Sequence, residues 1–209
     1  MNKQNRVDPW GKLKSVSARG AWLGNRGILH NEKQQIVAPW RHKSWVTCEL
    51  NFQGRKRDIF SPGNYSELFF LDEATALSAG HRPCAECRRE RYNEFKSLWC
   101  AANIGATSPS HVPIAQIDKQ LHLERAVRGG GKVTFQAELK AVPAGAFIEL
   151  NGVAFLLWLG RLHQWSPHGY SQTSLALSPS ELVTVLTPAS IVRLLQHGFE
   201  PQVHESARS

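Results

Sequence analysis

Two of the four cysteines in this 209-residue chain stand close together, in the segment "GHRPCAECRRER". A Cys-x-x-Cys pair places two sulfur atoms where both can bind one tetrahedral ion, at about 2.3 Å each for zinc. A redox-active pair would instead require a thioredoxin-like β-α-β pattern, and nothing upstream of Cys84 supplies one. Cys84 and Cys87 are therefore predicted to form half of a zinc site.

The remaining ligands must come from elsewhere in the chain. Cys48 lies at the end of "RHKSWVTC", on an expected strand, and His42 stands six residues before it. Cys100 follows the pair on an expected helix. A water molecule in the fourth position would give an open site of the kind found in catalytic zinc proteins.

The segment "FFLDEATALSAGHRPCAEC" resembles the zinc-binding domain of the Ada family of bacterial DNA alkyl-repair proteins. In that domain a short helix rich in Ala and Glu leads into Gly-aromatic-Arg-Pro-Cys-x-x-Cys, and related modules are attached to some bacterial nucleases. The resemblance extends over about residues 42–91, densely over 69–88 and loosely over 42–68. It implies bound zinc and a DNA partner.

The resemblance also bears on the other ligands. The Ada domain takes them from a Cys-x-x-x-Cys, whose first cysteine accepts a methyl group from a DNA phosphotriester. Here Cys48 is the single upstream cysteine, so it is the candidate for that reactive role. Relatives use His in place of one Cys, which makes His42 the leading fourth ligand. His81, which replaces the family's aromatic residue, comes next and Cys100 third.

Positive charge concentrates in the first half of the chain. Residues 1–100 hold 17 Lys and Arg against 10 Asp and Glu, which accounts for most of the net charge of +8. A basic half predicts an anionic partner, most commonly nucleic acid, although such charges can also serve solubility alone. Trp40 and Trp45 would offer faces for unpaired bases. The predicted nucleic-acid-binding residues are Arg41, Lys43, Arg55, Lys56, Arg57, Arg88, Arg89 and Arg91.

A second candidate site lies in "AQIDKQLHLERAVR". Asp118, His122 and Arg125 follow one another at i, i+4 and i+7, so a helix would present them on one face. An Asp that orients a His beside an Arg suits acid–base chemistry on a phosphodiester. The alternative is an exposed helix face with ordinary side-chain pairs.

Local patterns predict the elements that position these residues. Short strands broken by turn residues cover 21–52. Asp72 is expected to cap a short helix that ends at Gly80, and a second helix is expected over 85–103. A third helix is expected at about 113–127.

The rest of the chain reads mostly as sheet. Asn151-Gly152 stands between two apolar runs, which is the strongest short-range signal for a hairpin. Thr187-Pro188 precedes a C-terminal helix that ends at Gly198. No apolar run reaches the length of about 18 residues that a membrane helix needs, and the first residues lack a secretory signal, so we expect a cytoplasmic protein with no membrane partner.

We therefore predict an α+β protein in which a small zinc-stabilised α/β module precedes a β-rich domain. The β-rich domain would be a meander or barrel-like sheet with a C-terminal helix. The expected divisions are an N-terminal extension over 1–19, the Ada-like module over 20–103, the β-rich domain over 113–200 and a loose tail over 201–209.

The predicted function is zinc-dependent binding of nucleic acid, DNA more than RNA, in repair or processing. One alternative is a hydrolase or nuclease that uses Asp118, His122 and Arg125. Another is a structural-zinc module whose β-rich domain binds a protein or a small ligand. The sequence does not decide whether the chain is an enzyme, nor its oligomeric state.

Overall fold

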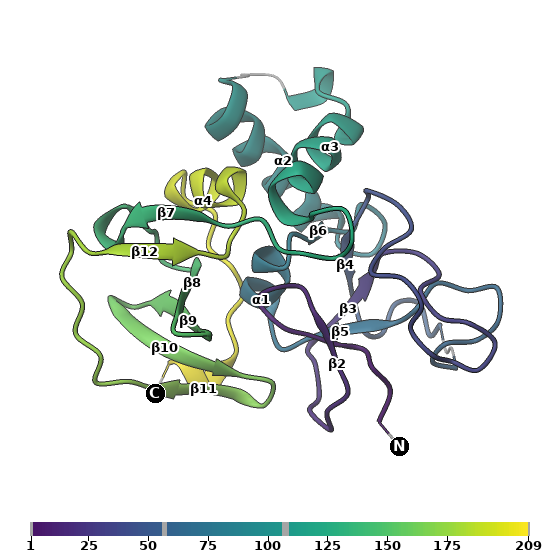
Figure 1. Ribbon diagram of the computed structural model, residues 1–209. Helices are drawn as coiled ribbons and strands as arrows, with labels where there is room; N and C mark the ends of the chain where they lie inside the picture. The colour runs from purple at the N-terminus through teal and green to yellow at the C-terminus, as the bar shows by residue number, and fades with distance from the viewer. Residues whose placement is uncertain (1, 56–57, 106–108, 209) are drawn as a thin grey trace.

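The computed structural model describes residues 2–55, 58–105 and 109–208. Four α-helices and two six-stranded sheets make up this part of the chain, which confirms the α+β class. Figure 1 shows the two sheets on opposite sides of the molecule, with the short helix α1 between them and α2 and α3 above.

The first sheet, sheet 1, comes from the N-terminal part of the chain, and Cys48 lies on one of its strands. Its order is β2-β1-β5-β3-β4-β6, and all neighbours are antiparallel except β1 with β5 and β4 with β6. Its strands are β1 (Arg6–Val7), β2 (Leu13–Lys14), β3 (Trp22–Asn25), β4 (Val46–Cys48), β5 (Leu68–Phe70) and β6 (Arg82–Pro83).

The second sheet, sheet 2, is antiparallel throughout, in the order β11-β10-β9-β8-β12-β7. Asn151 and Gly152 join β8 to β9 with positive φ at both residues, as a tight primed turn requires, so the predicted hairpin is confirmed. Its strands are β7 (Phe135–Glu138), β8 (Phe147–Leu150), β9 (Val153–Trp158), β10 (Arg161–Ser166), β11 (Gly169–Gln172) and β12 (Leu182–Val185).

The helices begin and end close to the predicted signals. The Asp72 side chain accepts a hydrogen bond from the Thr75 N–H at 2.8 Å and so caps α1 as predicted. Helix α2 starts later than expected because residues 84–88 form the turn that contains the cysteine pair. The helices are α1 (Glu73–Ser78), α2 (Arg89–Ile104), α3 (Ile114–Arg125) and α4 (Ala189–Gln196), with 3-10 turns at Pro109–His111, Leu139–Ala141 and Glu205–Ala207.

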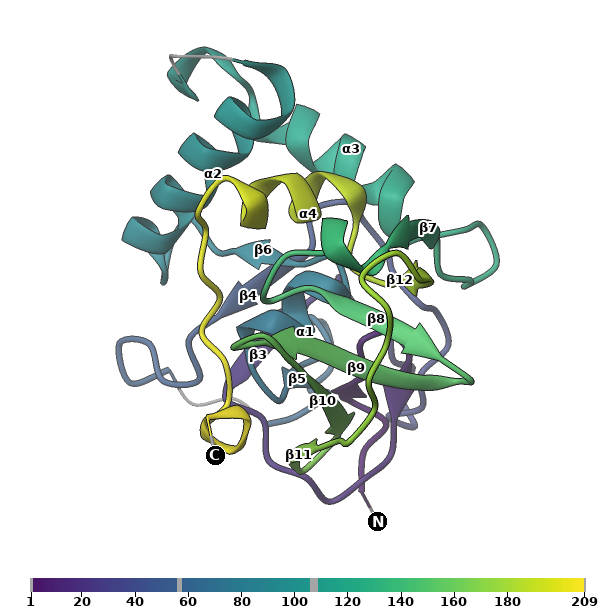
Figure 2. The same ribbon diagram turned by 90° about the vertical axis from the view of Figure 1, so that its left-hand side faces the viewer.

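The largest apolar core combines residues from both sides of the 104–112 segment. Phe95 and Trp99 of α2 pack in the same cluster as Ile117 and Leu121 of α3, together with sheet 2 and α4. Figure 2 shows α4 lying above sheet 2 and beside α2. Each part of the chain therefore buries apolar surface against the other, which is the main driving force of folding.

Segments near both ends of the described chain are built into the fold. Within the expected N-terminal extension, β1 pairs with β5 in parallel. The tail over 201–208, expected to be loose, is instead docked: Gln202 donates to the Glu73 carboxylate at 2.9 Å, and the His204 N–H donates to Asp72 at 3.0 Å. The expectation failed because buried acceptors upstream attract the tail's backbone N–H groups.

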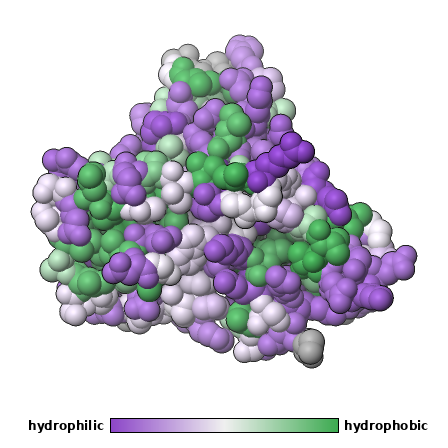
Figure 3. Space-filling model, viewed as in Figure 1, coloured by the Kyte–Doolittle hydropathy of each residue, from purple (hydrophilic) through white to green (hydrophobic). Residues whose placement is uncertain are grey.

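No helix within the described ranges combines the length and apolar character needed to cross a membrane. On the face shown in Figure 3, apolar side chains form separate patches divided by hydrophilic ones.

Candidate metal centre and adjoining pocket

Three cysteines meet where two parallel strands of sheet 1 end. β4 pairs with β6 through Val46 opposite Arg82 and Thr47 opposite Pro83. Cys48 follows Thr47 and Cys84 follows Pro83, so this pairing brings the two cysteines side by side. The Cys84 N–H donates to the Thr47 carbonyl oxygen at 2.9 Å. The turn after β6 then returns Cys87 to the same place. The ligand atoms of Cys48, Cys84 and Cys87 all lie within 4.8 Å of one another.

Backbone N–H groups already face the sulfur atoms. The Glu86 N–H donates to Cys84 Sγ and the Glu49 N–H donates to Cys87 Sγ, each at 3.4 Å. Hydrogen bonds of this kind stabilise the charged thiolate. A hydrogen bond from the Cys48 thiol lowers the pKa of Cys84 to about 5, and the same contact raises the pKa of Cys48. The cluster therefore favours a thiolate on Cys84 even without a metal.

Three half-buried thiols in this arrangement could bind one metal ion. Thiolates select soft and borderline ions. Among the described residues no His, Asp, Glu or further Cys joins the group, and none of the residues outside the described ranges is of these four types. Within the described part of the chain the group therefore consists of three cysteines, whereas a tetrahedral ion takes four ligands.

The cysteines form one wall of a cavity of about 260 Å³ on one face of sheet 1. Alternate residues of three neighbouring strands point to this face, as the two-residue period of a strand requires. Glu49, Leu50, Phe52, Arg55 and Ile59 supply the cover. The strand residues that line the cavity are Leu23 and Asn25 of β3, Val46 and Cys48 of β4, and Phe69 of β5, with Tyr65 and Glu67 just before β5.

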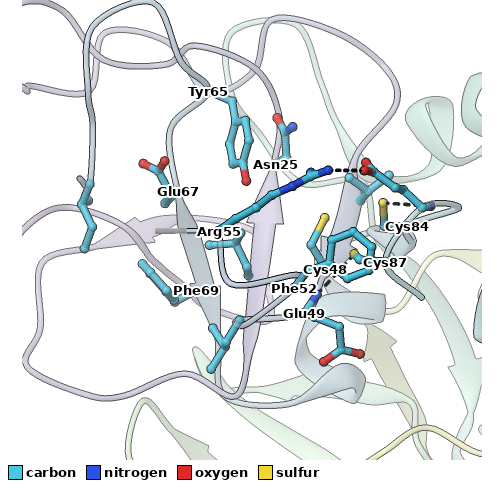
Figure 4. Close-up of a pocket in the computed structure, with 15 residues that line it drawn as sticks. Asn25, Cys48, Glu49, Phe52, Arg55, Tyr65, Glu67, Phe69, Cys84 and Cys87 are labelled. Carbon is cyan, nitrogen blue, oxygen red and sulfur yellow. Dashed lines mark hydrogen bonds and ion pairs between the residues drawn. The ribbon is translucent and has the colours of Figure 1, made fainter. Parts of the chain in front are cut away.

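Two polar residues of this cavity were missed by the sequence reasoning. Glu67 is only 3% exposed, and Asn25 lies on the neighbouring strand. Figure 4 shows Glu67 and the sulfur atoms on different sides of the drawn site. A two-residue alternation through "YSELFF" places Glu67 and Phe69 on one face, and that signal could have identified them.

The alternative fourth ligands lie away from the cluster. His42 precedes β4, beside Gly27 and within the electrostatic influence of Asp118 and Arg125, so it stands at the opposite end of the strand from Cys48. His42 was predicted as a ligand because relatives of the Ada-type domain use His in place of one Cys, but the extended strand carries Cys48 away from it.

The other two alternatives are buried elsewhere. His81 is fully buried, accepts a hydrogen bond from Arg26 at 3.1 Å and contacts the rings of Trp45 and Phe70. Cys100 packs in the large apolar core. Packing therefore determines where His81 and Cys100 lie.

The predicted nucleic-acid-binding residues separate into two groups. Arg88 is buried and pairs with Glu73 at 2.8 Å, and Arg91 pairs with the same carboxylate at 2.6 Å, so these two guanidinium groups are already bound. Arg41, Lys43, Arg55 and Arg89 are exposed, whereas Lys56 and Arg57 lie outside the described residues. Arg55 forms an exposed ion pair with Glu86 at 2.7 Å.

The two tryptophans that were predicted to stack on unpaired bases also differ in burial. Trp45 is buried, with the guanidinium groups of Arg26 and Arg125 each 4.1 Å from its ring centroid. Trp40 is half-buried and contacts the ring of His122. Trp45 therefore has no free face for a base.

The second candidate site is part of the packing between α3 and sheet 1. Asp118 is buried and forms a two-pronged ion pair with Arg82, at 2.7 and 2.9 Å. Arg125 is buried and donates to the carbonyl oxygens of Gly80 and Lys43. His122 packs against tryptophan rings.

The cavity beside the cysteines is not lined by Asp118, His122 or Arg125. The geometry gives Asp118, His122 and Arg125 structural roles.

The chain matches no protein-family model, and searches of curated proteins and of solved structures find no match either.

Proposed function

We propose that Cys48, Cys84 and Cys87 hold a zinc ion whose fourth position faces the cavity, so that a ligand can bind to the metal. The observation that carries this proposal is the convergence of three cysteines on the wall of a cavity that no fourth protein ligand closes. Catalytic zinc sites have three protein ligands and an open position, whereas structural sites have four.

Zinc is the ion that suits these ligands best. Thiolates bind it strongly, and a cytoplasmic location, which we also propose, would keep the thiols reduced. The resemblance of residues 69–88 to the Ada-type domain supports the same ion. A zinc ion in this place would supply a Lewis acid to whatever occupies the fourth position.

The chain's own residues prepare the site. The Glu49 and Glu86 N–H groups hold two of the sulfur atoms in place. Leu23 and Val46 form an apolar floor beside the cysteines, and Phe52 covers it. Such walls exclude water and strengthen electrostatic interactions within the cavity.

Cobalt substitution tests the open position. We expect the chain to bind one Co²⁺ with sulfur-to-metal absorption bands, and imidazole or a small thiol to shift the visible bands by occupying the fourth position. The Cys100→Ser variant should behave like the wild type because Cys100 is not a ligand. A tetrahedral spectrum that no added ligand changes would show a closed, structural site, and no metal uptake would overturn the proposal.

Binding of nucleic acid, more readily DNA than RNA, is the second proposal. Among the described residues no ion pair involves Arg41, Lys43 or Arg89, so these exposed cations can meet phosphates. The basic first half of the chain and the Ada-type resemblance support this partner.

The salt dependence of binding to a labelled DNA tests this second proposal. The double variant Arg41→Gln/Lys43→Gln should reduce the slope of log K against log salt by about two, since each phosphate contact contributes about one. No binding at low salt would contradict it and would leave the metal proposal intact.

A further inference from the structure

The cavity beside the cysteines contains a buried acceptor without a donor. Glu67 Oε2 accepts a hydrogen bond from the Phe60 N–H at 2.9 Å. Its other oxygen, Oε1, is buried and has no hydrogen-bond partner in the described part of the chain. A buried carboxylate oxygen without a donor is unfavourable, so its presence in a cavity wall indicates a ligand that donates to it.

A donor group lies on the strand next to this acceptor. Gly24 on β3 pairs with Leu68 on β5, and one further step along this register places Asn25 opposite Glu67. Asn25 Oδ1 accepts from the Gly27 N–H at 2.8 Å, which fixes the orientation of the amide. No described residue accepts a hydrogen bond from Asn25 Nδ2, which leaves this N–H₂ group for a ligand.

The remaining walls favour a flat ligand. Phe52, Tyr65 and Phe69 line the cavity. Aromatic side chains stack on nucleobases with about 1–3 kcal/mol per base. At about 260 Å³ the cavity is smaller than most sites for drug-sized ligands, which occupy roughly 300–1,000 Å³.

We infer that the cavity binds a heterocyclic base with an exocyclic amino group, of the cytosine or adenine type. Its amino group would donate to Glu67 Oε1, and the adjacent ring nitrogen would accept from Asn25 Nδ2. Uracil, thymine and hypoxanthine present the opposite order, an oxygen acceptor beside an N–H donor, and would leave both protein groups unpaired. The inference rests on the proposed function, because it takes the cavity beside the metal to be the ligand site.

Binding of nucleosides to the zinc-loaded full chain tests the inference by calorimetry. Cytidine and adenosine should bind at least about tenfold more tightly than uridine and inosine, since one matched pair of base contacts provides about 1–3 kcal/mol of discrimination. Labelled single strands of dC and dT form a second arm of the experiment. Preference with free nucleosides indicates a small-molecule ligand, whereas preference with strands alone indicates an unpaired base in nucleic acid.

Three variants identify the groups responsible. Glu67→Gln should reduce the cytidine preference to less than about threefold, because its amide nitrogen can meet the uridine oxygen. Glu86→Gln removes a charge from the same cavity and should keep the preference. Phe52→Leu should weaken the binding of cytidine and of uridine equally, and it supplies the test if Glu67→Gln does not fold.

Zinc content, measured in every sample, separates this inference from the metal proposal. Equal binding of cytidine and uridine by zinc-loaded protein would overturn the base inference alone. A preference that persists in protein that never takes up metal would overturn the metal proposal alone. A preference for uridine, or no binding of any nucleoside or strand, would overturn the inference.

Discussion

The two faces of sheet 1 carry opposite kinds of polar side chain. The cavity face gathers three thiols together with the Glu67 carboxylate, around a space of about 260 Å³. The opposite face gathers cations: Arg26 and Arg125 enclose the Trp45 ring, and Arg26 donates to His81. One sheet therefore carries the cysteine cluster on one face and the packing of arginines around Trp45 on the other.

This difference between the two faces shows why helical spacing alone is a poor guide to a functional site. Asp118 and Arg125 share a helix face as acid–base residues would, but that face packs on the cationic side of the sheet. Gly80 makes this packing possible, because a Cβ there would lie 2.3 Å from Arg125 Cδ. Access to a cavity, rather than spacing, distinguishes the cysteines from this trio.

The largest effect should follow from removing a ligand on the cavity face. Cys84→Ser is expected to reduce zinc content from about one per chain to less than about a tenth and to lower the Tm. Zinc at structural sites contributes about 10 kcal/mol or more of apparent binding energy. Metal analysis and thermal unfolding, with and without chelator, measure both. Full zinc occupancy in Cys84→Ser would contradict the assignment, and Cys100→Ser is the control.

The next largest effect should come from the cationic face. Asp118→Asn leaves Arg82 buried without its charged partner, which costs about 3–5 kcal/mol for a pair of this type. Urea unfolding measures the loss, and zinc content should not change. Glu138→Gln, in an exposed pair with Lys140, should cost less than about 1 kcal/mol. A loss of zinc in Asp118→Asn would show that the two faces are coupled.

Lys132, on the cationic face, makes the free energy of unfolding depend on pH. Its Nζ donates to the Ser78 carbonyl oxygen. Burial, followed by the charges of Arg26 and Arg125, lowers its pKa to about 7, against the opposing effect of Asp8. An unfolded lysine keeps its proton up to about pH 10. Between these values the unfolded state binds the extra proton, so the free energy of unfolding rises with pH, by at most about 1.4 kcal/mol per pH unit.

Lys132→Met should remove this contribution and stabilise the protein at pH 7, where the buried ammonium is unfavourable. Urea unfolding at pH 7, 8 and 9 compares the variant with the wild type. Lys140→Met, at an exposed position, should keep the wild-type slope. Identical slopes in wild type and Lys132→Met would show that the ammonium is not desolvated.

Local signals predicted much of the fold. The Asp72 cap and the Asn151-Gly152 hairpin depend on neighbouring residues, and both are present. The Cys-x-x-Cys was recognised because its two cysteines are close in sequence. Cys48 joins them because β4 and β6 pair in parallel. Long-range pairing of this kind leaves no mark in local sequence, so the prediction of Cys48 depended on the scarcity of cysteine and on family resemblance.

Burial was harder to predict than secondary structure. Arg88 and Arg91 look like a solvated basic run, but they converge on Glu73, which is buried at the start of α1. Glu67 looks like an ordinary strand residue, but it is buried in the wall of a cavity that Phe52 and Ile59 also line. In both cases the decisive partner is distant in sequence, and charge patterns alone do not reveal it.

The smallest effect on stability should come from Arg55, at the rim of the cavity. Arg55 and Glu86 form an ion pair whose side chains are 45% and 60% exposed, so Arg55→Gln should change the free energy of unfolding by less than about 1 kcal/mol. The same variant should reduce the salt slope of DNA binding by about one if Arg55 meets a phosphate. Arg91→Gln is the matched contrast: it should destabilise the fold, since Glu73 loses a buried partner, and leave the slope unchanged. An unchanged slope in Arg55→Gln, or a reduced one in Arg91→Gln, would show that exposure does not determine which arginines meet the nucleic acid.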